Sequence, residues 1–265
     1  MIQVEAYRKR RPLVLSSPLT LGVILIALSA GPVMPLYCMA FVLSGAASLQ
    51  NSNSVLSEYT VNQKDAEAIA FGIVFGYIVP SLALPAIRNV MAFTLWFGYH
   101  AYIAILLTSW RAMRPDTPQA DTTIIKGLYA LSFVATSITH VVVFLSKMHD
   151  LKVLKDFFVP PTSALEPNLT QSPTWDLDLF RWDLVLTLLA MMVATLWFAK
   201  DAKERSRIFI FHVIGTMTIG PSASVCGVLL WREICLTKGL EGPTEKGGRY
   251  LKGSATSNGN GVSSH

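Results

Sequence analysis

Residues 125–145 read IKGLYALSFVATSITHVVVFL, a stretch in which Lys126 is the only side chain with a full charge at neutral pH. A helix needs roughly 20 consecutive apolar residues to cross a bilayer, so this stretch is long enough. Five other blocks have similar length and character. We therefore predict an all-α fold, a multi-pass transmembrane helix bundle with about six spans. The expected spans are residues 19–43, 66–86, 91–110, 125–145, 179–199 and 208–231.

The overall composition agrees with a membrane protein. Of the 265 residues, 52% are hydrophobic and 15% are charged, whereas soluble domains carry about 25% charged residues. The net charge is +5, and much of the basic excess lies in the two tails, including residues 8–11. Basic residues beside spans signal membrane topology. We expect no soluble domain that could bind in a nucleic-acid groove. We therefore expect membrane lipid around the chain and no nucleic-acid partner.

The same pattern divides the chain into three parts. Residues 1–18 are a basic N-terminal tail, residues 19–236 form the transmembrane helical domain, and residues 237–265 form a Gly-, Ser- and Asn-rich tail that we expect to be disordered. The three cysteines, Cys38, Cys226 and Cys235, have a spacing that fits neither a metal site nor a disulfide framework.

Ionisable residues at membrane depth are the strongest functional signal, because they are costly to bury in lipid. His140 lies near the end of the fourth block, Asp183 near the start of the fifth, and Glu233 closes the sixth. If six spans hold, all three lie in one layer on the same side of the membrane. Simpler interpretations stay open: Asp183 pairs with Arg181 or Arg232, His140 bonds to a neighbouring helix, and Glu233 belongs to a solvated helix end.

Such a layer suits acid-initiated chemistry on an apolar chain. A carboxylic acid in an apolar site has a raised pKa and can protonate an epoxide or alkene, while a histidine orients the acid or receives a proton. Aromatic rings stabilise a developing carbocation, although Trp and Tyr are also enriched at membrane interfaces. The candidate substrate-binding residues are Tyr77, Trp96, Tyr99, His100, Trp182 and Trp231.

Metal-binding motifs are absent from the sequence. It holds no DDxxD pattern for a diphosphate–magnesium site, and Asp176, Asp178 and Asp183 have no diagnostic spacing. We therefore expect no metal and no cofactor, with Mg²⁺ entering only if the substrate is a diphosphate.

An ordered series of short motifs resembles the fungal membrane-bound terpene cyclases, the family that includes the ascofuranone and ascochlorin cyclases. The resemblance covers roughly residues 20–235. Its pieces are GPVMPLY at 31–37, FGYIVPS at 75–81, LYA at 128–130, TH at 139–140, FVPP at 158–161, LFRWD at 179–183, GP at 220–221 and LWRE at 230–233. The sequence departs from the family at residues 98–100, where a proline-containing stretch is expected.

The resemblance implies a multi-pass enzyme of the endoplasmic reticulum membrane that cyclises a lipophilic farnesyl-derived substrate, an epoxidised meroterpenoid or a sesquiterpenoid, in secondary metabolism. The enzyme that the resemblance implies is a terpene cyclase of the isomerase or lyase type. The resemblance implies that His140 and Asp183 are the catalytic residues, with Glu233 as the third candidate. Two alternatives remain: a sterol-isomerase-like membrane enzyme, and a non-catalytic scaffold or transporter. Transporters often show inverted repeats, and none is visible here.

Overall fold

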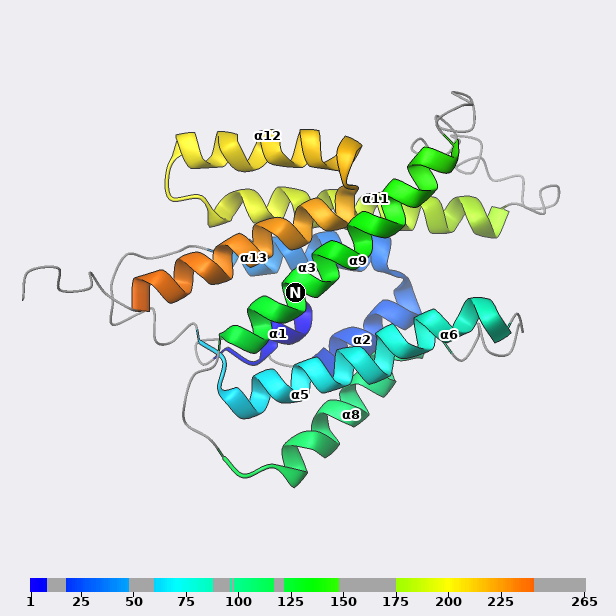
Figure 1. The fold of residues 1–265 in the computed structure, drawn as a ribbon, viewed down its shortest axis with the longest axis vertical. Helices are drawn as coiled ribbons and strands as arrows, with labels where there is room; N and C mark the ends of the chain where they lie inside the picture. The colour runs from blue at the N-terminus through cyan, green and yellow to red at the C-terminus, as the bar shows by residue number, and fades with distance from the viewer. Residues whose placement is uncertain are drawn as a thin grey trace, which may run out of the picture.

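The computed structural model describes residues 1–8, 18–47, 60–87, 96, 98–116, 122–147 and 175–240, and the elements in these ranges are helices (Figure 1). The all-α class is thereby confirmed for the described residues. In chain order the elements are α1 (Ile2–Ala6), α2 (Pro18–Leu28), α3 (Ala30–Leu43), α5 (Gln63–Ile73), η3 (Val74–Ile78), α6 (Val79–Ile87), α8 (Tyr99–Met113), α9 (Thr123–Lys147), α11 (Trp175–Thr195), η5 (Leu196–Phe198), α12 (Ala202–Thr218) and α13 (Pro221–Leu240).

Three of the described helical stretches are long and apolar enough to cross a membrane: Gln63–Leu84, Thr123–Ser146 and Arg181–Phe198. Six crossings remain a prediction. The outer surface of α9 supports a lipid environment, because its exposed large residues are apolar and recur every three or four positions, which places them on one face. They are Leu131, Val134, Ile138, Val142 and Leu145. A large exposed apolar face of this kind marks a membrane or partner surface.

The first expected span is broken into two helices. Helix α2 ends at Leu28 and α3 begins at Ala30, with Ser29 between them at φ 73. The expected span over residues 19–43 is therefore not one continuous helix. Residues with positive φ interrupt a right-handed helix, and the backbone N–H groups freed at the start of α3 need acceptors from elsewhere.

The last expected span is also broken, which changes the direction of the chain. Helix α12 ends at Thr218 and α13 begins at Pro221, and Gly220 between them has φ 94. Glycine adopts this conformation without a Cβ penalty, and proline is favoured at the first position of a helix. As a result, α13 folds back along α12 (Figure 1), so residues 208–231 form parts of two helices that run in opposite directions and not one helix.

The second expected span is continuous but contains a wider turn. Between α5 and α6, η3 is a π-helical turn in which the Val79 N–H donates to the Val74 carbonyl. Such turns occur as local bulges in α-helices. Gly76 in this turn lies against α8, where an added Cβ would come within 2.8 Å of the Ile103 nitrogen. The missing side chain thus allows η3 and α8 to approach closely.

Two long pairings and a shorter one build the core. Helix α3 packs along α11, α9 packs along α13, and α5 packs along α8. Between α3 and η5, the rings of Phe41 and Phe198 meet edge to face at 6.1 Å. Both rings are fully buried, which fixes the end of α3 against the end of α11.

Candidate functional site

Four charged side chains form a buried network between α1 and α13. Arg232 Nη1 donates to Glu5 Oε1 at 2.5 Å, and Arg8 Nε donates to the same oxygen at 3.0 Å. Arg8 also forms an ion pair with Glu233. Their side chains are at most 3% exposed. The four formal charges, two positive and two negative, sum to zero, which is the condition under which buried charges are tolerated.

Arg232 connects this network to the rest of the core. Its Nη2 donates to the Ala46 carbonyl at 2.9 Å, just after α3. Its guanidinium also lies 4.4 Å from the centre of the Phe198 ring and 5.6 Å from that of Phe41. These are cation–π distances. One side chain of α13 therefore holds the N-terminal helix, the end of α3 and the end of α11 together.

The pKa shifts of Glu5 and Arg8 favour the charged form of both side chains. Burial alone raises the pKa of Glu5, but the charges and hydrogen bonds of Arg232 and Arg8 outweigh it, and the net pKa is lowered. Burial alone lowers the pKa of Arg8, but Glu233 and Glu5 outweigh it and the net pKa is raised. Arg8 thus departs from the expected role of a topology signal in a basic tail, because it is buried against acidic partners.

A cavity of about 220 Å³ lies among α1, α5, α9, α11 and α13. Its polar side chains are Tyr129, Ser132, Ser222 and Cys226, and the others that line it are apolar. Glu233 and Glu5 are close enough to Tyr129 to act on it electrostatically. The charged network therefore lies beside a mainly apolar, partly open cavity.

Asp183 caps a helix from a distance in sequence. Its carboxylate accepts the backbone N–H of Gly31 at 2.5 Å and that of Ala30 at 3.1 Å. Both groups belong to the first turn of α3, where free N–H groups and the helix dipole favour an anion. Gly31 leaves room for this contact, because a Cβ there would overlap the carboxylate. The sequence-based alternatives, pairing with Arg181 or Arg232, did not include this capping role.

His140 lies at the break between α12 and α13. Its ring is so close to Gly220 that an added Cβ would be 2.6 Å from the His140 Cγ, and it stacks on Phe144 with ring centres 5.9 Å apart. Glu233 does not share this layer. It lies twelve residues after Pro221, roughly 18 Å along a helix at 1.5 Å per residue. The expected single layer was wrong for Glu233, because the break at Gly220 reverses the chain.

Four of the predicted aromatic residues do come together, at the junction of η3 and α8. The ring of Tyr77 lies 4.9 Å from that of Tyr99 and 6.1 Å from that of Trp96, and the Tyr99 ring lies 4.0 Å from that of His100. Trp96 Nε1 donates to Ser81 Oγ at 2.9 Å. The group is only partly buried, because Tyr77 is 38% exposed, and its ring pairs are tilted against one another.

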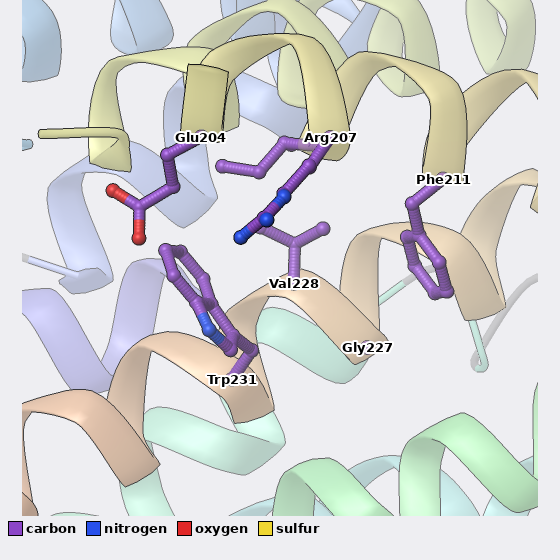
Figure 2. A pocket seen from close by; sticks show the side chains of 7 residues that line it. Glu204, Arg207, Phe211, Gly227, Val228 and Trp231 are labelled. Carbon is purple, nitrogen blue, oxygen red and sulfur yellow. The ribbon is translucent and has the colours of Figure 1, made fainter. Parts of the chain in front are cut away.

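The other two predicted aromatic residues lie elsewhere. Trp182 is half-buried next to Asp183 on α11. Trp231 lines a separate pocket of about 300 Å³ between α12 and α13, together with Glu204, Arg207 and Phe211. In Figure 2 its indole ring rises from α13 toward the side chains of Glu204 and Arg207 on α12 and lies below both. Trp231 is about 200° around the helix from Leu229, which lines the central cavity, so it faces away from that cavity.

The sequence analysis missed two buried polar sites, the pair of Glu5 and Arg8 and the single residue His212. Glu5 and Arg8 lie in the segment expected to be a tail, and their signal was a pair of opposite charges three residues apart in a stretch with helical spacing. His212 was hidden inside an apolar block. It is 2% exposed and lies 2.7 Å from Thr195 Oγ1 and 3.1 Å from Ser224 Oγ. It joins α12 to the ends of α11 and α13.

Within the described ranges, no group of three or more His, Cys, Asp or Glu side chains is placed to hold a metal ion. Asp176 and Asp178 were considered as Mg²⁺ ligands if the substrate is a diphosphate. They belong to α11, but the described part of the structure does not include their side chains.

Comparison with known proteins identifies the family. No curated protein and no solved structure matches the chain. The CtvD domain matches residues 1–237, which include the buried N-terminal helix α1 and end where the expected C-terminal tail begins. The match agrees with the resemblance to fungal terpene cyclases and supports a cyclase-like function in secondary metabolism. The chain belongs to the CtvD domain family.

Proposed function

We propose that this chain is a membrane-bound terpene cyclase that closes rings on a farnesyl-derived substrate by acid protonation, without a metal. The observation that carries the proposal is a charged, buried network beside a mainly apolar, partly open cavity, in a chain of the CtvD domain family. The apolar outer face of α9 supports a lipid environment for the chain, and we propose that this is the endoplasmic reticulum membrane and that the lipophilic substrate enters from it.

The proposed reaction is balanced by the transfer and return of one proton. An acid protonates a terminal epoxide oxygen, the C–O bond breaks, and positive charge develops on carbon. The π electrons of an alkene form the new C–C bond, and loss of a proton ends the sequence. Aromatic faces stabilise the cationic stages, and a water-poor site protects them from hydrolysis.

Asp183, His140 and Glu233 are the residues proposed to deliver and remove the proton. The observed contacts constrain these roles. Asp183 accepts two backbone N–H groups and Glu233 is paired with Arg8, so each carboxyl group would have to share or exchange these partners to take part in a proton transfer. His140 is the third group proposed for that transfer.

The test is expression in microsomes with candidate epoxy-farnesyl substrates and farnesyl diphosphate, followed by product analysis. Asp183→Asn should abolish the cyclic product while the protein remains in the membrane, because an amide cannot accept the proton. Asp201→Asn is the matched control. Asp201 caps α12, accepting the Glu204 N–H at 2.7 Å, and asparagine caps nearly as well as aspartate, so product formation should persist.

The outcomes separate the alternatives. Loss of product in Asp183→Asn but not in Asp201→Asn supports a role in the reaction beyond helix capping. Full product in Asp183→Asn refutes that role. A shifted sterol double bond without ring closure would indicate a sterol-isomerase-like enzyme. Conversion of neither the epoxide nor the diphosphate would favour a scaffold or transporter.

A further inference from the structure

The surface of α12 changes from charged to apolar along its length. Between residues 200 and 207, at the start of the helix, the chain carries four basic and two acidic side chains. Further along, the large exposed side chains are apolar: Phe209, Ile210, Val213, Ile214 and Met217. In the membrane that we propose for this chain, the apolar part lies in the hydrocarbon and the charged part at the level of the lipid headgroups. The pocket between α12 and α13 lies at this boundary, because both Arg207 and Phe211 line it.

Side chains of both charges line this pocket beside an aromatic ring. Its volume is about 300 Å³, and its lining includes Glu204, Arg207 and Trp231, with Phe211 and Val228 on the apolar side. Figure 2 shows the Glu204 carboxylate and the Arg207 guanidinium extending from α12 toward the Trp231 ring on α13. Among the described residues these two charged groups form no ion pair with each other, although they are only three positions apart. Each charge is therefore available to a ligand.

The start of α12 holds Glu204 in place. Its Oε2 accepts the Lys200 backbone N–H at 2.6 Å, and its own backbone N–H donates to Asp201 Oδ1 at 2.7 Å. Reciprocal bonds of this kind fix a side chain at the start of a helix. Oε1 accepts no hydrogen bond from the part of the chain that the structure describes, so one carboxylate oxygen is left for a ligand.

A carboxylate, an indole ring and a guanidinium together suit a zwitterion. Aromatic rings bind quaternary ammonium groups by cation–π attraction, and a carboxylate nearby adds the attraction of opposite charge. A guanidinium binds phosphate oxygens through two parallel hydrogen bonds. A phosphocholine headgroup carries the phosphate and the quaternary ammonium a few bonds apart. The acyl chains attached to it would continue onto the apolar part of α12.

We propose that this pocket binds the headgroup of one phosphatidylcholine molecule from the surrounding bilayer. Arg207 binds the phosphate, Trp231 and Glu204 bind the quaternary ammonium, and an acyl chain lies against Phe211. A purely anionic headgroup fits less well, because Glu204 repels it. The inference rests on the proposed membrane location of the chain, and it does not depend on the cyclase reaction.

The experiment is native mass spectrometry of the purified full-length chain in a non-ionic detergent. The probes are dioleoylphosphatidylcholine and dioleoylphosphatidylglycerol, which share their acyl chains and differ in the charge of the headgroup. We expect one tightly bound phosphatidylcholine, and Arg207→Gln should weaken its binding about tenfold, the effect of one hydrogen bond to a charged group. Arg205→Gln is the matched control. It removes the same charge about 200° around the helix, from a residue that does not line the pocket, and it should leave binding unchanged.

Two further variants test recognition of the ammonium group. Glu204→Gln should weaken phosphatidylcholine and leave phosphatidylglycerol unchanged or tighter, because it removes a negative charge. Trp231→Leu should weaken phosphatidylcholine more than Trp231→Phe, which keeps an aromatic ring. Equal weakening by Leu and Phe would overturn the role of the ring.

A general attraction of a basic helix for anionic lipid gives a different pattern. It predicts tighter binding of phosphatidylglycerol than of phosphatidylcholine in the wild type, and equal losses in Arg205→Gln and Arg207→Gln. Either result would overturn the proposal. Because lipid binding is measured without turnover, these results leave the proposed cyclase reaction untouched. Selective phosphatidylcholine binding by a chain that forms no cyclic product would support this site and refute only the proposed reaction.

Discussion

Replacing Arg232 with methionine tests whether the buried network holds the N-terminal helix to the bundle. The change keeps an apolar side chain of similar length but removes the donors to Glu5 and Ala46. Breaking a buried ion pair by removing one partner costs about 3–5 kcal/mol. At about 2–4 °C per kcal/mol for a chain of this size, even the lower value predicts a fall in Tm of about 6–12 °C.

A double-mutant cycle with Glu5→Gln identifies the cause of that loss. Arg232→Met leaves two carboxylates facing one cation, and Glu5→Gln leaves two cations facing one carboxylate. The double variant retains one matched pair, Arg8 with Glu233. We therefore expect each single variant to be strongly destabilised, and the double variant to be more stable than the sum of the two losses predicts, with a coupling energy of about 1–3 kcal/mol.

The measurement is thermal unfolding in detergent micelles or nanodiscs, with membrane insertion checked separately. The exposed pair of Lys64 and Asp116, which lie 2.7 Å apart with Asp116 at 96% exposure, provides the control. Its removal by Lys64→Met should cost less than about 1 kcal/mol. Strictly additive losses for Arg232→Met and Glu5→Gln, or losses no larger than the Lys64 control, would show that the network does not stabilise the fold.

Two further predictions concern acid and the helix break. Because the folded-state pKa of Glu5 is lowered from 4.5, its contribution to stability is complete above about pH 4.5 and is lost as the pH falls through the folded-state value. Acid titration of the Tm should therefore show a steeper decline for wild type than for Glu5→Gln, and parallel curves would contradict this. Gly220→Ala should destabilise the protein by at least about 1–3 kcal/mol, because the residue combines φ 94 with a Cβ position 2.6 Å from His140. Gly45 shares the positive φ (74), but a Cβ there would meet nothing within 4 Å. Gly45→Ala should therefore lower the free energy of unfolding by less than Gly220→Ala does. Equal losses in the two variants would show that the contact with His140 contributes nothing.

The helical, membrane-compatible character of the chain followed from the sequence because it depends on local properties. The length and apolarity of residues 125–145 predicted α9, and the structure has it at Thr123–Lys147. Tyr77, Trp96 and Tyr99 were among the six substrate-binding candidates named from the sequence, and their rings meet, but that they would meet was not predicted and their binding role stays a prediction. A period of 3.6 residues and a length near a bilayer thickness need no knowledge of distant contacts.

Only the tertiary structure determines the contacts between segments that lie far apart in the chain. Glu5 and Arg232 are separated by 227 positions, and Asp183 caps α3 across 152 positions. No local pattern in the sequence marks such partners. Glu5 and Arg8 were therefore assigned to a tail, and Asp183 was predicted as a catalytic acid without its role as the cap of α3. The reversal at Gly220 placed Glu233 away from His140 for the same reason. Hydrophobicity fixes which residues leave water, but only the packing of helices determines which buried charges meet.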